Sequence, residues 1–192
     1  MPIFRMPINK PYIGKIPKVH NYTLSDGLQG NIETIQIMKR IARYRSGNSF
    51  IRALALKVLE HYQVDSQNHV LEALALGDFV KNKVIYRRDP TYIEQVQDPL
   101  KIAIDINNDG IAYGDCDDMA TFLATLLLSV GFMPYFRAVR YEPNVSNYNH
   151  IYVVVYDTNW GGIEKRVVLD PILKRYKIGT EVPHYNGDEF SV

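Results

Sequence analysis

The sequence is short of cysteine and has no excess of charge of either sign. It contains one cysteine among 192 residues, which excludes an internal disulfide and a metal site built on paired cysteines. Its 22 basic and 21 acidic side chains leave a formal net charge of +1. Strong attraction to nucleic acid or to an anionic membrane surface is therefore not expected. A reducing compartment suits a free thiol.

Long hydrophobic runs and a secretory signal are also missing. No uninterrupted apolar run approaches the roughly 20 residues that a membrane-spanning helix needs. The N-terminus is not followed by an apolar segment with a small-residue cleavage site. With 46% apolar residues at this length, one domain with a single core is expected, without membrane association.

Residues 1–28 are predicted to form an extended arm. Pro2, Pro7, Pro11 and Pro17 recur there among basic and single apolar residues. Each proline fixes φ and removes a backbone donor, which disfavours a helix or a central strand. Such an arm would lie on its own domain, remain disordered or dock on a partner. The remainder, residues 29–192, is predicted to be the folded domain, with its core at about 69–175.

The first half of the domain is predicted to be helical. Apolar residues recur at helical spacing over three segments, and Asn48 or Ser49 is a suitable N-cap for the second. Val84–Tyr86 is typical of a short strand. An irregular stretch and a long loop are expected to lead from this strand to Cys116. The three helical segments are residues 32–45, 50–62 and 69–82.

The second half begins with one more helix and continues as strands. After Cys116 the pattern is helical to Val130, and Gly131 suits the turn that follows. Helices first and antiparallel strands later indicate an α+β domain, in which the Cys116 helix packs against the sheet. The expected strands are residues 135–141, 151–156 and 167–169, and the chain from Lys174 onward is expected to be coil.

Cys116 is the candidate nucleophile. It is expected in the first turn of its helix, where unsatisfied N–H groups and the helix dipole favour an anion. Gly114 allows a close backbone approach, and Asp115 is a suitable N-cap. The adjacent carboxylates oppose thiolate formation, so they must point away or be paired, or a histidine must supply the activation. The alternative is a buried cysteine acting as a small hydrophobic residue.

His150 and Asp170 complete a candidate triad. His150 begins a predicted strand, unlike the other four histidines, and its imidazole would take the thiol proton. Asp170 ends the next strand, and pairing of the two strands would bring its carboxylate to the imidazole, which it would orient. The alternatives are a surface histidine near a turn and an Asp-Pro turn that ends a strand.

Residues 105–110 match the first half of a calcium-binding EF-hand loop. The twelfth position is Cys116, where a bidentate glutamate is required, so a surface turn is the preferred interpretation and structural calcium the alternative. The backbone N–H of Cys116 is the expected first donor of an oxyanion hole. The calcium candidates are Asp105, Asn107 and Asp109, and the candidates for the second donor are Tyr113, Asn107 and Asn108.

Three motifs together resemble the transglutaminase-like superfamily of papain-like thiol enzymes. Gly114–Asp118 and the Ala/Leu-rich helix after it resemble the nucleophile helix of that superfamily. Asn149–Val153 resembles its histidine strand and Val168–Pro171 its aspartate strand. The resemblance covers roughly residues 28–175. In two places the chain departs from it: Asn149 stands where relatives often have a bulky residue, and the loop 101–112 looks longer than usual.

Within the superfamily the chain is most similar to small transglutaminase-like proteins of bacteriophages and prophages, through Gly30–Ala42 and Phe79–Arg87. The resemblance implies hydrolysis of amide bonds in a peptide or protein, or acyl transfer to an amine. It implies no cofactor or metal, and a location in the bacterial host cytoplasm or the virion. Some relatives are inactive, so a silent virion or assembly scaffold is the alternative, with its arm docked on other phage proteins. An open cleft above Cys116 would favour the enzyme.

Overall fold

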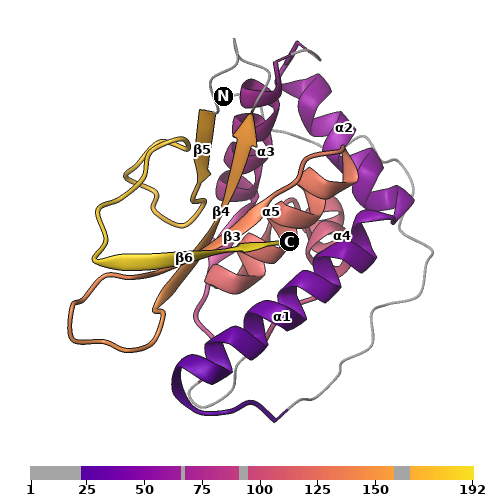
Figure 1. Cartoon of the computed structure of the whole chain (residues 1–192). Helices are drawn as coiled ribbons and strands as arrows, with labels where there is room; N and C mark the ends of the chain where they lie inside the picture. The colour runs from indigo at the N-terminus through magenta and orange to yellow at the C-terminus, as the bar shows by residue number, and fades with distance from the viewer. Residues whose placement is uncertain (1–22, 66–67, 91–94, 158–164) are drawn as a thin grey trace.

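The computed structural model describes residues 23–65, 68–90, 95–157 and 165–192, and these form five helices and two sheets (Figure 1). Helices precede the antiparallel strands along the chain, so the predicted α+β class is confirmed. Residues 1–22 of the predicted arm lie outside the described residues, and its last two, Gly27 and Leu28, already belong to the first helix. No helix in the described part of the chain is both long and apolar enough to cross a membrane.

The first three helices follow the predicted periodicity. They are α1 (Gly27–Ser46), α2 (Ser49–His61) and α3 (His69–Lys83). The break after α1 is explained by Asn48, whose side chain accepts hydrogen bonds from the N–H groups of Phe50 and Ile51 at 2.9 and 3.4 Å. These bonds satisfy donors that the start of α2 would otherwise leave open.

The predicted loop between residue 99 and Cys116 is wrong. This stretch contains α4 (Pro99–Asp109) and β2 (Ala112–Gly114). Asp98 caps α4 by accepting a hydrogen bond from the N–H of Leu100 at 2.9 Å, and Gly110 ends the helix with a φ of +81°. The segment that resembles half an EF-hand is therefore helical, and the surface turn predicted for it is also wrong.

The strands form two sheets. β1 (Val84–Tyr86) pairs in parallel with β2. The larger sheet is antiparallel and has the order β5-β4-β3-β6. Its strands β3 (Tyr135–Arg140), β4 (His150–Asp157) and β5 (Lys165–Leu169) agree with the predicted ones. The prediction of coil fails at β6 (Asn186–Ser191), which pairs with β3 along its whole length.

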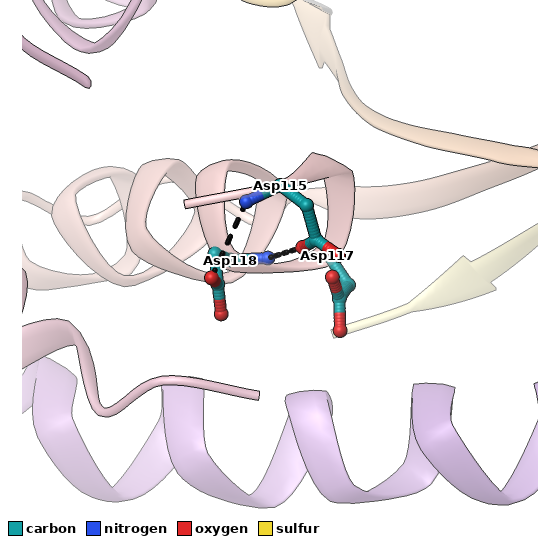
Figure 2. A group of neighbouring side chains, drawn as sticks. All are labelled: Asp115, Asp117 and Asp118. Atoms are coloured by element: carbon teal, nitrogen blue, oxygen red, sulfur yellow. Dashed lines mark hydrogen bonds between the residues drawn. The ribbon is translucent and has the colours of Figure 1, made fainter. Parts of the chain in front are cut away.

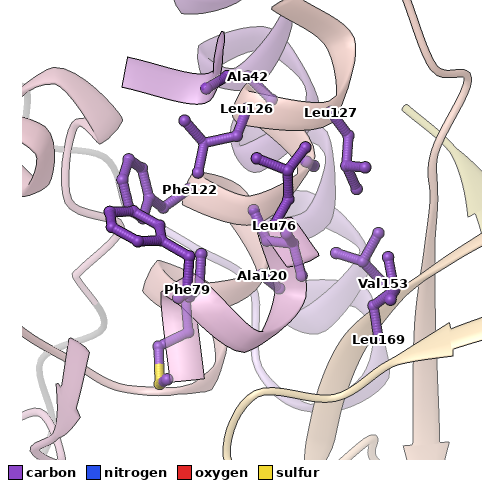
Figure 3. Close-up of a cluster of buried hydrophobic side chains, with 14 of the residues drawn as sticks. Ala42, Leu76, Phe79, Ala120, Phe122, Leu126, Leu127, Val153 and Leu169 are labelled. Atoms are coloured by element: carbon purple, nitrogen blue, oxygen red, sulfur yellow. The ribbon is translucent and has the colours of Figure 1, made fainter. Parts of the chain in front are cut away.

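Helix α5 (Cys116–Ser129) is the centre of the core. It contacts the other four helices and the strands β2, β3 and β4, so almost all of its side chains are buried. Figure 3 shows Phe122 and Leu126 of this helix beside Phe79 of α3, with Val153 and Leu169 approaching from the sheet. The prediction that the Cys116 helix packs against the sheet is confirmed.

Candidate thiol site

Cys116 is the first residue of α5 and is partly exposed. The N-cap before it is Asp115, as predicted. Asp115 accepts a hydrogen bond from the N–H of Asp118 at 3.4 Å, and Asp118 accepts one from the N–H of Asp115 at 3.3 Å (Figure 2). This reciprocal capping box fixes the first turn of the helix. The thiol therefore stands at the helix end where the dipole favours negative charge.

Gly114 is required by the close approach of the chain to α5. A Cβ atom at this position would lie 2.7 Å from the Cβ of Asp118, inside van der Waals contact. The prediction that Gly114 permits a close approach is confirmed. Its role is therefore steric, and any larger residue would push the entry to α5 away from the capping box.

Asp118 is fully buried and joins α5 to the stretch before α4. Its carboxylate accepts hydrogen bonds from the backbone N–H of Gln97 at 2.6 Å and from the side-chain amide of Gln97 at 2.5 Å. Burial raises the pKa of Asp118 to about 7, opposed by the bonds from Gln97 and assisted by the charge of Asp115. Near neutral pH this carboxyl is partly uncharged, which lessens its repulsion of a thiolate at Cys116.

The three aspartates at this helix end could also ligate a metal ion. Asp115, Asp117 and Asp118, drawn in Figure 2, each offer a carboxylate oxygen, and these oxygens lie within 4.8 Å of one another. Such oxygens suit hard cations. Both oxygens of Asp118, however, already accept hydrogen bonds from N–H groups. Helix capping accounts for the arrangement of Asp115 and Asp118.

His150 and Asp170 lie where the sequence predicts them. His150 is the first residue of β4, and Asp170 directly follows the last residue of β5, the neighbouring antiparallel strand. The imidazole Nε2 lies 2.7 Å from Asp170 Oδ2, and both side chains are buried. The other oxygen of Asp170 accepts a hydrogen bond from the N–H of Ile172 at 3.0 Å. Since Nε2–H donates to Asp170, Nδ1 is the ring nitrogen left to act as a base.

Tyr141 connects these groups and is absent from the sequence-based predictions. Its ring stacks on that of His150, with centroids 5.6 Å apart and planes at 23°, and its N–H donates to the side chain of Asn149 at 3.2 Å. Burial raises the pKa of Tyr141 to about 12, with further contributions from the charges of Asp170 and Cys116. The stacked ring and the backbone bond to Asn149 therefore hold Tyr141 against the His150 imidazole.

The side of the sheet on which His150 stands limits how it can meet the thiol. Alternation along β4 places Ile151 in the main core and His150 on the same side as Tyr152, which belongs to a second apolar cluster. α5 packs against the core side of this sheet. The imidazole and the thiol can therefore meet only around the end of β4, which is the position that His150 occupies.

The three candidates for the second donor of the oxyanion hole lie on α4 and β2, the two elements before Cys116. Asn107 and Asn108 are on α4, where the Asn107 amide donates to the Asn108 side chain at 3.1 Å. Tyr113 is on β2 with its ring exposed, and the guanidinium of Arg87 lies 4.9 Å from its centroid. Asp105, a calcium candidate, forms an ion pair of 2.5 Å with a lysine one turn earlier in α4.

No family model and no curated protein sequence matches this chain. Among solved structures, a proposed cysteine protease from Cytophaga hutchinsonii is similar, with a TM-score of 0.42 and 16% identity over 64% of this chain. The match spans only 38% of the Cytophaga chain. LapG of Legionella pneumophila is similar with a TM-score of 0.38 and 18% identity, over 76% of this chain and 75% of that one. Neither likeness assigns a role to a residue of this chain.

Proposed function

We propose that this protein is a cysteine-dependent enzyme acting on amide bonds, a peptidase or amidase in its simplest form. Cys116 is the nucleophile, His150 the acid-base group and Asp170 the group that orients the imidazole. The observation that carries the proposal is the buried 2.7 Å bond between His150 and Asp170. A surface histidine and a simple Asp-Pro turn would have no need of this bond, and burial without a partner would be costly for both groups.

The first half of the reaction follows from the orientation of the imidazole. Asp170 holds Nε2–H, so Nδ1 takes the proton of the Cys116 thiol and the sulfur attacks the carbonyl carbon of the substrate. A C–S bond forms, and the carbonyl oxygen becomes an oxyanion. The N–H groups at the start of α5 point out of the helix and would stabilise it.

The second half releases the two products. The oxyanion collapses, the C–N bond breaks, and the imidazolium returns its proton to the leaving amine. The acyl group is left as a thioester on Cys116. Nδ1 then takes a proton from water, whose oxygen attacks the thioester and releases a carboxylic acid and the thiol. If an amine takes the place of water, the same steps give acyl transfer.

The test is the rate at which iodoacetamide alkylates Cys116, followed by intact mass as a function of pH. Labelling is confined to one site because the sequence has one cysteine. We expect fast alkylation that persists below pH 7 in the wild type and is lost in His150→Ala. His69→Ala is the matched control, since His69 is exposed at the start of α3.

Two results would contradict the proposal. One is slow alkylation whose rate rises only as the pH approaches ~8.5, the pKa of an ordinary thiol, and which is unchanged in His150→Ala. The other is an equal loss in His150→Ala and His69→Ala. The first would mean that the three residues have no chemical role, as in a silent scaffold. The second would mean that the loss in His150→Ala does not come from the imidazole acting on the thiol.

A further inference from the structure

A hollow of about 420 Å³ lies between α3 and the segment Lys174–Ile178, which follows β5. Its lining carries four cations against a single carboxylate, that of Asp78. The whole chain has a formal net charge of only +1. Positive charge is therefore more concentrated in the pocket lining than in the chain as a whole. The four cations are Lys81, Lys174, Arg175 and Lys177.

Lys81 is a cation removed from water. Its side chain is on α3, the residue is 9% exposed, and Nζ donates to the carbonyl of Leu173 at 2.9 Å and to that of Tyr176. Carbonyl dipoles compensate a buried ammonium less well than a carboxylate does. Within the described ranges, no carboxylate forms an ion pair with Lys81 or with the other three cations. Negative charge is what the pocket lacks.

The carboxylate in the lining does not supply this charge to Lys81. Asp78 accepts hydrogen bonds from the Tyr62 hydroxyl at 2.7 Å and from the Asn82 amide at 2.9 Å, both through the same oxygen. These bonds tie Asp78 to its own helix and to the end of α2. The four cations of the lining therefore outnumber one carboxylate, and the bonded oxygen of that carboxylate faces Tyr62 and Asn82.

The segment that carries the three exposed cations is anchored at both ends. Lys81 holds two of its carbonyls, and the N–H of Gly179 donates to Val168 of β5 at 2.9 Å. Ile178 packs so closely on Gly77 that a Cβ there would lie 3.0 Å from the Ile178 methyl carbon. An anchored backbone lowers the entropy cost of binding, because less of the segment has to be ordered by the ligand.

The segment that lines the pocket follows the candidate thiol site along the chain. It begins a few residues after Asp170, whose carboxylate lies 2.7 Å from the His150 imidazole and accepts a hydrogen bond from the N–H of Ile172 at 3.0 Å. The next residue, Leu173, offers its carbonyl to Lys81 in the pocket at 2.9 Å. A short run of residues therefore joins the partner of His150 to the cations of the pocket.

We propose that this pocket binds an acidic side chain of a polypeptide whose amide bond is presented to Cys116. Presentation of the amide bond to Cys116 rests on the proposed function. Binding of the acidic side chain does not depend on it. A hollow lined by cations and by the apolar side chains Leu74 and Ile178 suits a glutamate, with its methylene groups and terminal carboxylate. A nucleic acid is disfavoured because the near-neutral chain has no long-range positive field to attract it.

The test uses the full chain with Cys116→Ser, so that no peptide is consumed. Fluorescence anisotropy measures the affinity for a labelled peptide of alternating glutamate and glycine, for its glutamine counterpart and for single-stranded oligothymidylate. The variant Lys174→Gln/Arg175→Gln/Lys177→Gln removes the exposed cations of the pocket. The matched control, Lys39→Gln/Arg40→Gln/Arg43→Gln, removes the same charge from α1, which does not line the pocket.

We expect the glutamate peptide to bind about tenfold more tightly than the glutamine peptide, and the pocket variant to lose about tenfold in affinity for it. The α1 variant should keep that affinity within about twofold. With the wild-type chain, saturating glutamate peptide should slow alkylation of Cys116. Equal binding of the two peptides, an equal loss in the α1 variant, or tighter binding of oligothymidylate would overturn the proposal.

Failure of the proposed function would be seen in a different measurement. Slow alkylation that is unchanged in His150→Ala would reject the proposed enzymatic function. The peptide affinities of the Cys116→Ser chain would still test the pocket on their own. The glutamate peptide could instead bind in a charge-dependent way without slowing the alkylation of a reactive Cys116. The pocket would then not be part of the substrate site, and the proposed enzymatic function would stand.

Discussion

The ring of Tyr141 covers one face of the His150 imidazole, at a centroid separation of 5.6 Å and an interplanar angle of 23°. The edge of the same imidazole is held by Asp170. The backbone of Tyr141 is fixed by Asn149, the residue before His150. One short hairpin therefore supplies both the imidazole and the ring that restrains it.

Replacing Tyr141 should separate the role of its ring from that of its hydroxyl group. Tyr141→Ala should slow alkylation of Cys116 at neutral pH by up to about tenfold, because an aromatic pair contributes about 0.5–1.5 kcal/mol. Tyr141→Phe keeps the ring and should alkylate like the wild type. Equal rates in the wild type and Tyr141→Ala would show that the stack does not position His150.

Replacing Asp170 should disturb the imidazole without removing it. Asp170→Asn should reduce alkylation at neutral pH by about 10²-fold, since the amide no longer stabilises the imidazolium or fixes its tautomer. Asp188→Asn is the control, because Asp188 is exposed and also accepts a hydrogen bond, from Tyr148. If Asp170→Asn alkylates at the wild-type rate and its circular dichroism is unchanged, Asp170 has no role in activating the thiol.

Gly114 and Gly47 make a matched pair for testing the entry to α5. Gly114→Ala should lower the free energy of unfolding by about 2 kcal/mol, because its Cβ would overlap Asp118. Gly47→Ala should change it by less than about 1 kcal/mol, since its φ is −77° and the nearest atom to its Cβ is 4.0 Å away. Urea unfolding measures both, and equal values would contradict the steric role of Gly114.

Asp118 should make the protein less stable as the pH rises from about 4 to 7. Its pKa is raised from 3.8 to about 7 by burial, so in this interval the unfolded chain ionises this carboxyl while the folded one keeps its proton. Ionisation favours the unfolded state, and the loss approaches about 4 kcal/mol for a shift of this size. Asp118→Asn should remove most of this dependence.

The control for this pH profile is Asp109→Asn, because Asp109 is exposed at the end of α4. Its profile should follow that of the wild type. The free energy of unfolding is measured with urea at each pH, and the difference between a variant and the wild type cancels the contribution of the histidines. A wild-type profile in Asp118→Asn would mean that Asp118 is ionised in the folded protein.

The predicted elements are right where the pattern of buried residues decides the structure. α2, α3 and the strands β3, β4 and β5 each bury apolar side chains at regular positions, which leaves a pattern in the sequence. α4 carries the same signals, with Asp98 before Pro99 and Leu100, Ala103 and Ile106 buried. The alternating Asp and Asn residues suggested a calcium loop instead. β6 gives little signal because backbone pairing with β3 holds it, and none of its side chains is fully buried.

The candidate site divides in the same way. Cys116, His150 and Asp170 stand at the ends of elements, and the sequence shows where a helix or strand begins or ends. Gln97 and Tyr141 come from loop ends whose partners lie in other elements. Their roles depend on how α4 and the β3–β4 hairpin are placed in space, and no local pattern in the chain encodes that placement.

The solitary thiol has a consequence under oxidising conditions. A sulfenic acid formed at Cys116 has no second cysteine in the chain with which to close a disulfide. Cys116 is partly exposed, and its sulfenic acid would persist until a small thiol from the surroundings, such as glutathione, condensed with it. Peroxide would therefore block this thiol reversibly only where such thiols are abundant, and elsewhere oxidation would continue to the sulfinic acid.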